Sequence, residues 1–379
     1  MIRLFLALLL VFPLPALAAS ACVPVGGWRD LADGAPVAAD TLLARAAQAS
    51  VVLLGERHDS AAHHRWQLDV IQALAAGEHP IALGLEMVPR RHQPALDRWV
   101  AGETDEQTFL KEVEWQKVWR FDPDLYLPIL RFARDRRIPL VALNVDQGLV
   151  RRVGTEGWAA VPAGQREGVG DPAPAAPAYL DRLAAIHALH RPGESDTESG
   201  RDDPGFRRFV EAQLLWDRAM AERIAEARRE TGRQVMAIMG GGHLEERLGV
   251  PYQLADIGIK DALVLLPWDT DRDCADLSPS LADAVYAVPP EPEPRRPRLG
   301  VALEPDADGA RVAGVMPGSV AARAGLQTGD VVLRAGGQAV AAPEDLIRVV
   351  RDQPAEAALA LTVRRAADTV ELTARFPAD

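Results

Sequence analysis

A cluster of titratable side chains follows the first apolar run of the sequence. In the segment VVLLGERHDSAAHHRW (51–66), Glu56 and His58 come directly after the run and His63 and His64 follow, so three of the eight histidines fall within seven residues. Imidazole and carboxylate groups bind metals and cofactors and transfer protons near neutral pH. The segment therefore predicts a metal or cofactor site, an acid/base pair, or an ordinary turn between a strand and a helix.

A second histidine stands in the same context far along the chain. The apolar run 234–240 ends in a glycine, and His243 follows that glycine by three residues, as His58 follows Gly55. Glycine allows a sharp turn and leaves room for a ligand against the backbone. A single histidine of this kind usually caps a helix or bonds a backbone carbonyl. The matched pair favours a shared functional site.

Polar side chains also end two other apolar runs. Glu86 ends the second run, and Asn144 and Asp146 follow the third. Ligands of open parallel sheets bind beyond the carboxyl ends of the strands, so these groups are expected to gather near the histidines. Two histidines with carboxylates suit Zn, Mn or Fe, and a carboxylate could act as a general base on bound water. The candidate metal ligands are His58, His243, Glu56 and Glu86, and the candidate catalytic residues of a metal-dependent hydrolase are Glu56 and Glu86.

Aromatic side chains are concentrated in the segment 113–130, although they make up only 5% of the chain. Four of them fall within twelve residues, at Trp115, Trp119, Phe121 and Tyr126. Packing in a core is the default interpretation, and a flat apolar wall of a ligand site is the alternative. Tyr126 could also bind ferric iron as a phenolate, as could Tyr179 or Tyr252, and the residues alone do not choose among them. Arg57 is placed to offset an anionic group at the mouth of such a site.

The elements that must position these residues alternate between strands and helices. Five nearly continuous apolar runs are typical of strands buried on both faces, and helical patterns lie between them. This alternation predicts an α/β fold with a largely parallel sheet flanked by helices. The first domain is expected over 22–285, with an inserted helical subdomain at about 150–230. The predicted strands are 51–55, 81–86, 139–144, 234–240 and 262–268.

A small second domain follows a proline-rich linker, expected at 286–297. The segments RLGVAL, GVMPGSVAARAGLQTGDVVLRAGGQAV and LALTVRR closely resemble a PDZ domain of the bacterial periplasmic type. The resemblance implies a mostly-β domain over 298–377 that captures a protein or peptide C-terminus by strand addition. RLGV resembles the carboxylate-binding loop of that family, so the candidate peptide-binding residues are Arg298, Leu299, Gly300 and Val301.

The N-terminus and the two cysteines predict an exported protein. Residues 1–18 combine Arg3, a short apolar stretch and Ala-Leu-Ala, which is typical of a cleaved secretory signal and predicts a periplasmic location. Cys22 could pair with Cys274 in an oxidising compartment, or it could carry a lipid that anchors the protein to a membrane. The net charge of −12 argues against nucleic acid as a partner.

The first domain also resembles the ChaN-like haem-binding uptake family of the Tiki superfamily. The segments that carry the resemblance are LLGERHDSAAHHRWQLDVI, LGLEMVPRRHQPALDRWVAG, WRFDPDLYLPILRFARDRRIPLVALNV, FVEAQLLWDRAMAERI and GGGHLEERLGVPYQL. It runs from about residue 51 to 268 and implies a haem bound in a pocket shared by two subunits, with a tyrosine ligand to iron. The related Tiki branch implies metal-dependent proteases that use the equivalents of Glu56, His58, Glu86 and His243.

Two functions of the first domain therefore compete. The resemblance favours an exported haem-binding protein for haem or iron uptake or handling, which could form a homodimer. The residues alone argue equally for a metal-dependent hydrolase of the peptidase or esterase type. The candidate haem-binding residues are His58, Arg57, Glu86, Tyr126, Tyr179 and His243.

Overall fold

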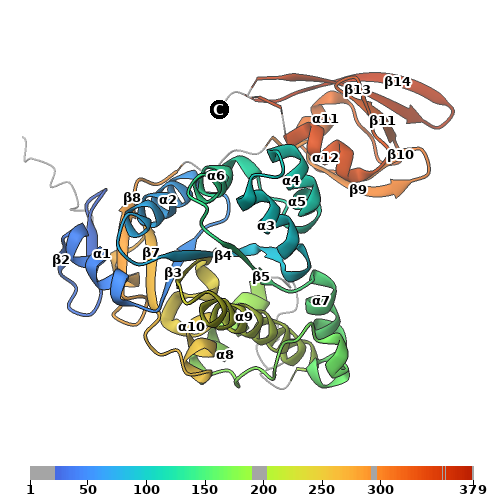
Figure 1. The fold of residues 1–379 in the computed structure, drawn as a ribbon. Helices are drawn as coiled ribbons and strands as arrows, with labels where there is room; N and C mark the ends of the chain where they lie inside the picture. Colours follow the sequence, from blue (N-terminus) through green and yellow to red (C-terminus); the bar gives the residue numbers. More distant parts are fainter. Residues whose placement is uncertain (1–21, 190–202, 292–296, 352, 355, 378–379) are drawn as a thin grey trace, which may run out of the picture. The chain divides into compact units, whose positions relative to one another are not determined.

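The chain forms two compact units, Met1–Glu291 and Pro292–Asp379, in a computed structural model (Figure 1). The structure describes residues 22–189, 203–291, 297–351, 353–354 and 356–377. The predicted signal at 1–18 and residues 292–296 of the predicted linker lie outside these ranges. No helix within the described ranges is long and apolar enough to span a membrane.

An eight-stranded sheet forms the centre of the first unit, in the order β2-β1-β8-β7-β3-β6-β4-β5. The six strands from β8 to β5 in this order are parallel to one another, and β1 and β2 add an antiparallel edge, so the predicted α/β class is confirmed. The strands are β1 (Trp28–Asp30), β2 (Pro36–Val37), β3 (Val51–Glu56), β4 (Ile81–Pro89), β5 (Leu140–Asn144), β6 (Gln234–Gly240), β7 (Leu263–Asp269) and β8 (Ala284–Val288).

The sequence pattern predicts five of these strands and misses three at one edge. β1 and β2 have three and two residues, too few to show a periodicity. β8 continues the sheet to Val288, three residues beyond the expected end of the domain at 285.

Helices cover both faces of the sheet because successive residues of the central strands point to opposite sides. Val52 and Leu54 of β3 join one core, and Val51 and Leu53 join the other. The first core includes residues of α1 (Ala39–Gln48), α2 (Ala61–Ala75), α3 (Gln93–Ala101), α4 (Glu106–Glu112), α5 (Trp115–Val118) and α6 (Leu127–Asp135). The second core includes residues of α9 (Pro204–Thr231) and α10 (Val250–Asp256).

The expected helical insertion at 150–230 is only partly separate from the sheet. α9 lays Met220, Ala221 and Ile224 on the sheet, so this helix is part of the central fold. α7 (Gln147–Glu156) and α8 (Pro177–Leu189) pack on α9 in two smaller clusters.

The 3-10 turns of the first unit, in the part of the chain that the structure describes, are η1 (Arg90–His92), η2 (Pro123–Leu125), η3 (Trp158–Ala160), η4 (Ala163–Gln165), η5 (Gly241–His243), η6 (Glu245–Arg247) and η7 (Cys274–Asp276).

The chain leaves β3 and β6 in opposite directions. From β3 it crosses β6 to reach β4, and from β6 it crosses β3 to reach β7. Glu56 at the end of β3 pairs in register with Gly240 at the end of β6. Diverging connections of this kind leave a crevice beyond the carboxyl ends of the strands. The fold therefore places the candidate residues at a natural ligand position.

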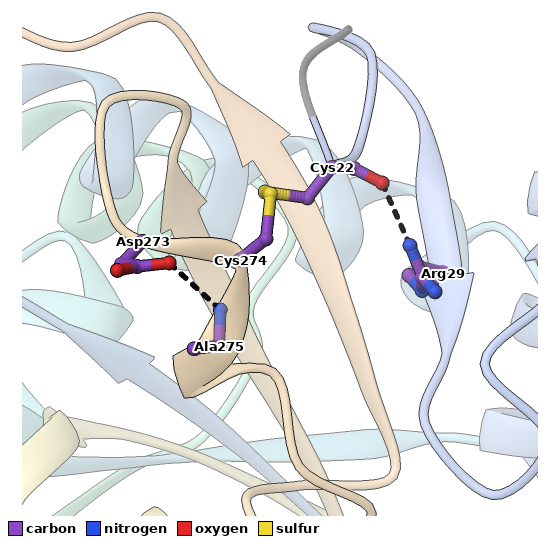
Figure 2. The surroundings of a disulfide bond; sticks show 5 residues. All are labelled: Cys22, Arg29, Asp273, Cys274 and Ala275. Atoms are coloured by element: carbon purple, nitrogen blue, oxygen red, sulfur yellow. Dashed lines mark hydrogen bonds between the residues drawn. A yellow bond between two sulfur atoms is a disulfide. The ribbon is translucent and has the colours of Figure 1, made fainter. Parts of the chain in front are cut away.

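A disulfide joins Cys22 to Cys274, with the two Cα atoms 5.5 Å apart (Figure 2). The Arg29 guanidinium donates to the Cys22 carbonyl at 2.8 Å, and the Asp273 carboxylate accepts from the Ala275 amide at 2.9 Å at the start of η7 (Figure 2). The predicted pairing is present. The lipid anchor that Cys22 could otherwise carry would need the same sulfur atom.

The second unit is a six-stranded antiparallel sheet with two helices. β9 lies at the edge of the order β14-β13-β11-β10-β9, and β12 pairs with β11. The elements are β9 (Val301–Asp306), β10 (Gly309–Val315), α11 (Val320–Ala324), β11 (Val331–Ala335), β12 (Gln338–Ala339), α12 (Pro343–Arg351), β13 (Ala358–Arg365) and β14 (Asp368–Arg375). The predicted mostly-β domain is confirmed.

Candidate functional site

Four residues singled out in the sequence meet at the crevice beyond β3, β4 and β6. Glu56 ends β3, His58 follows it, Glu86 lies in β4 and His243 lies in η5 after β6. The Glu86 carboxylate accepts from the Gly240 amide at 2.6 Å and lies 3.5 Å from Nε2 of His243. The Glu56 and Glu86 side chains are buried, whereas that of His58 is 29% exposed. His58 is therefore the member of this group that a ligand can reach.

Glu56 holds His58 in one orientation. Oε1 of Glu56 accepts from Nδ1 of His58 at 2.8 Å and from the Tyr126 hydroxyl at 2.7 Å. A histidine that donates through Nδ1 to a carboxylate keeps a lone pair on Nε2, as in many metal-binding histidines. Nε2 of His58 has no hydrogen-bond partner among the described residues. Burial alone would lower the pKa of His58, but the hydrogen bond to Glu56 and the charge of Glu86 outweigh it and raise the pKa.

His63 and His64 are both buried and both support this arrangement. The Ser60 hydroxyl caps α2 by accepting from the His63 amide and so fixes the start of the helix that carries both rings. Nδ1 of His63 accepts from the Arg57 amide at 2.9 Å, and Nε2 lies 3.2 Å from Asp269. His63 thus fixes the backbone between Glu56 and His58.

The two ring nitrogens of His64 face only oxygen acceptors. Nε2 lies 3.2 Å from the His58 carbonyl, and Nδ1 lies 3.1 Å from Oε1 of Gln67 and 3.3 Å from Oε2 of Glu56. The amide nitrogen of Gln67 donates to the Leu54 and Gly55 carbonyls, so its oxygen must face His64. The His64 ring therefore contacts both the Glu56 carboxylate and the backbone carbonyl of His58.

His243 is held between two carboxylates. Its Nδ1 lies 2.6 Å from Oδ1 of Asp217, whose other oxygen accepts from the Tyr179 hydroxyl at 2.6 Å. Burial alone would lower the pKa of His243, but Glu86 and Asp217 outweigh it and raise the pKa to about 10. Burial would in turn raise the pKa of Glu86, and the charge of His243 holds it below its usual range. His243 is therefore a buried imidazolium.

Asp217 was not among the site residues predicted from the sequence. It lies on the buried side of α9 between Trp216 and Arg218, and it is 0% exposed. A carboxylate on the apolar stripe of a long amphipathic helix is a signal that could have indicated a buried partner, because an ionised carboxylate is rarely buried unpaired.

The candidate tyrosines are poorly placed to become phenolates. Tyr126 and Tyr179 are 1% and 2% exposed, and each donates its hydroxyl proton to a carboxylate. Burial, followed by the charge of Glu56, raises the pKa of Tyr126, and burial with the charge of Asp217 does the same for Tyr179. Tyr252 is exposed on α10. In this structure Tyr126 and Tyr179 act as donors that fix carboxylates.

A cavity of about 400 Å³ opens beside His58. Its wall is largely apolar, and the His58 ring packs against Trp119 and Phe121 with ring centroids 4.6 and 5.0 Å apart. The volume falls in the range of small-molecule and cofactor sites. The lining residues are His58, Met87, Pro89, Val118, Trp119, Phe121, Asn144, Val145, Gln147, Val150, Arg151 and Trp216.

The aromatic segment is divided between the core and this cavity. Trp115 and Tyr126 are buried in the core, whereas Trp119 and Phe121 line the cavity. The segment thus contributes to the core and to the wall of a cavity, and a ligand against that wall stays a prediction. Arg57 lines a different cavity, of about 360 Å³, and pairs with Asp269 at 2.9 Å. It therefore does not offset charge in the cavity beside His58.

The predicted metal site is not supported. Among the described residues, no group of three or more His, Cys, Asp or Glu side chains is arranged to hold a metal ion. The physical reason is that His243 has each ring nitrogen directed at a carboxylate, and His58 has only Nε2 left over. His243 faces Glu86 at 3.5 Å, whereas His58 is held by Glu56 at 2.8 Å, so the two rings have different carboxylate partners.

The glycine before each histidine is required for space and not for a left-handed turn, since neither has a positive φ. A Cβ on Gly55 would lie 2.3 Å from Cδ2 of Leu266. A Cβ on Gly240 would lie 2.8 Å from Cε1 and 3.1 Å from Nε2 of His58. Gly240 therefore forms the surface against which the His58 ring rests.

Replacing Gly240 with alanine is expected to displace the His58 ring and to weaken the binding of any ligand through Nε2 by about tenfold. Changes to residues that orient a metal ligand lower its affinity by about 10- to 100-fold, and we expect the lower end of that range here. The matched control is Gly242→Ala, since a Cβ at Gly242 would meet nothing within 4 Å. Ligand titration of both variants checks this. Equal affinities would contradict the role given to Gly240.

Comparisons with known proteins cover most of the first unit. A family model described as "Haem-binding uptake, Tiki superfamily, ChaN" matches residues 42–254, which is more than half of the chain. The chain belongs to this family. Among solved structures, "Cofacial heme binding to ChaN of Campylobacter jejuni" is 18% identical with a TM-score of 0.54, covering 68% of this chain and 95% of that chain. At that identity the likeness shows the shared fold. No curated protein matches the chain.

The second unit of this ChaN-family protein is a PDZ domain. A PDZ family model matches residues 311–365. An HtrA-type protease AlgW with a decapeptide is 28% identical over 21% of this chain and 28% of that chain, with a TM-score of 0.20. The HtrA3 PDZ domain bound to a phage-derived ligand is 23% identical over 21% of this chain and 82% of that chain, with a TM-score of 0.19.

The candidate peptide-binding residues Arg298, Leu299, Gly300 and Val301 lead into the edge strand β9. Gly300 has φ +77°, and a Cβ there would lie 2.4 Å from Cβ of Ser319, so this position needs glycine. The Leu299 and Gly300 carbonyls accept from Ala321 and Met316 at 2.8 and 2.9 Å. The loop is thus tied down through its carbonyls, next to an edge that can accept another strand.

The residues beside the first cavity fit a haem. A haem needs an apolar slot for the macrocycle and a ligand to iron, and the cavity offers an aromatic wall and Nε2 of His58.

Proposed function

We propose that the first unit binds haem in the cavity beside His58, with Nε2 of His58 as the ligand to iron. The observation that carries the proposal is the Glu56–His58 hydrogen bond of 2.8 Å at the wall of an aromatic cavity, in a chain of a haem-binding family. Glu56 fixes the ring and leaves its second nitrogen free.

The iron ligand proposed here is a histidine, whereas the family resemblance implies a tyrosine. Tyr126 and Tyr179 would each have to lose a proton whose removal is disfavoured by burial and by a neighbouring carboxylate. Nε2 of His58 needs no such change above the raised pKa of His58. A bound haem would supply an iron centre for redox or transport chemistry, while the residues of this chain hold it and exclude water from one side.

A haem titration of the full chain tests the proposal. We expect a shift of the Soret band that saturates near one haem per chain. Sedimentation of the same samples with and without haem reports whether a homodimer forms, as the family resemblance implies. A Soret band that stays at its position for free haem would contradict haem binding by this chain.

We propose that the protein acts in the periplasm in haem or iron uptake or handling. The Cys22–Cys274 disulfide supports this, because such bonds persist in oxidising compartments. The test is to separate periplasm, cytoplasm and membranes of producing cells, and to measure growth of a deletion strain with haem as the iron source. A cytoplasmic protein with reduced cysteines, or a deletion strain that grows as the parent does, would contradict this role.

The PDZ domain gives a second proposed binding function, capture of a protein C-terminus on β9. The support is the edge position of β9 and the glycine-dependent loop at 298–301. Peptides with free C-termini are expected to bind the full chain, and the same peptides with amidated C-termini are expected to bind at least about tenfold more weakly. Equal binding of both sets would contradict carboxylate capture.

A further inference from the structure

One face of α7 forms the polar side of the cavity beside His58. Gln147, Val150 and Arg151 all line the cavity, and their i, i+3 and i+4 spacing places them on one side of the helix. The Gln147 side chain donates to the Val118 carbonyl at 2.7 Å, which ties the start of α7 to the aromatic wall. The helix thus holds Arg151 at a fixed place relative to the wall.

A second hollow continues from the cavity past Arg151. This hollow has a volume of about 380 Å³ and shares Pro89, Val118, Gln147 and Arg151 with the cavity beside His58. Arg151 therefore stands where the apolar cavity passes into a polar region. A ligand whose flat body lies against Trp119 and Phe121 would reach this position with its edge.

Arg151 differs from the other cations of the hollow in lacking a counter-ion. Arg91 donates to Glu114 at 2.7 Å and pairs with Asp146, and Lys117 donates to Glu114 at 2.8 Å. In the part of the chain that the structure describes, no carboxylate pairs with the Arg151 guanidinium. At the mouth of the cavity, the positive charges of Arg91 and Lys117 are therefore balanced by carboxylates, and that of Arg151 is not.

We propose that Arg151 binds a carboxylate carried by the ligand of this cavity. Arginine presents parallel N–H groups that match a carboxylate, and the charge-assisted bonds it makes are stronger than neutral ones. The site then selects a flat apolar ring with at least one acidic substituent, such as a porphyrin with free propionates. This inference rests on the proposed haem site and assigns it a second recognition point, separate from the iron ligand.

Three ligands separate this role from iron ligation, namely haem, haem dimethyl ester and metal-free protoporphyrin. We expect the full chain to bind the ester about tenfold more weakly than haem, as the loss of a charged hydrogen bond predicts. Arg151→Gln should weaken haem and the metal-free porphyrin by a similar factor, and it should abolish the difference between haem and its ester. His58→Ala should weaken haem while leaving the metal-free porphyrin nearly unchanged.

Arg152→Gln is the matched control. Arg152 neighbours Arg151 on α7 but pairs with Glu156 at 2.9 Å and does not line the cavity. Equal affinity of the wild-type chain for haem and its ester, or equal affinities of the two glutamine variants, would overturn the role of Arg151 and leave haem binding intact. A wild-type chain that binds none of the three ligands would contradict the proposed function and this inference together.

Discussion

His58→Ala is expected to lower the affinity for haem by about a hundredfold or more and to move the Soret band toward that of free haem. Loss of a group that merely orients a metal ligand already costs about 10- to 100-fold, so loss of the ligand itself should cost at least as much. The fold should survive, because the ring lies at the cavity wall with its side chain 29% exposed. Titration followed by absorbance measures the effect.

The control for this variant is His79→Ala, because His79 is exposed and lies outside the cavity lining. Its haem affinity should equal that of the wild type. An unchanged affinity in His58→Ala would show that another residue holds the iron.

The affinity for haem should also fall as the pH falls. A proton and the iron compete for Nε2 of His58, and the pKa of this ring is raised above its usual value by Glu56 and Glu86 despite burial. The loss should therefore set in at a pH above the ordinary histidine range and continue below it. In His58→Ala the remaining affinity should vary less over the same range.

Asp217→Asn is expected to cost about 3 kcal/mol or more of the free energy of unfolding of the first unit. Nδ1 of His243 lies 2.6 Å from Asp217 in a buried pair, and removing this carboxylate charge leaves the imidazolium with Glu86 as its one carboxylate partner. All eight tryptophans lie at or before residue 268, so tryptophan fluorescence during denaturation reports the first unit alone. The control Asp256→Asn breaks a surface pair with Arg218 and should cost under about 1 kcal/mol.

The charged pair of His243 and Asp217 should also affect how the free energy of unfolding depends on pH. The pKa of His243 is raised from 6.5 to about 10 in the folded protein. A raised pKa contributes stability that is fully present below pH 6.5 and is lost as the pH rises through 10. The wild type should therefore lose stability across this window more steeply than Asp217→Asn. Parallel profiles of the two proteins would contradict a charged His243.

Periodicity and the Gly-x-x-His pair were enough to predict that Glu56, His58, Glu86 and His243 gather at one edge of the sheet. The apolar runs before Glu56 and Gly240 are buried on both faces, so their lengths show in the sequence, and strand ends carry the histidines to one edge. What the two histidines bind could not be predicted. That depends on Asp217, which comes from the middle of a helix and binds Nδ1 of His243, and on Glu86, which faces Nε2.

The role of the neighbouring cations likewise depends on tertiary packing. Arg57 stands next to His58 in sequence, but successive residues after a strand point to different sides, and its guanidinium pairs with Asp269. Arg151 has no distinctive context in the sequence. It reaches the cavity only because α7 packs against α9 with its first turns beside Trp119.

We propose above all that the iron is held by His58 and not by a tyrosine. Resonance Raman spectra of the ferric haem complex of the full chain test this most directly, because an iron–imidazole and an iron–phenolate bond give different vibrations. We predict imidazole ligation that disappears in His58→Ala, with no phenolate bands in the wild type. Phenolate bands that persist in His58→Ala would contradict the account and assign the iron to a tyrosine.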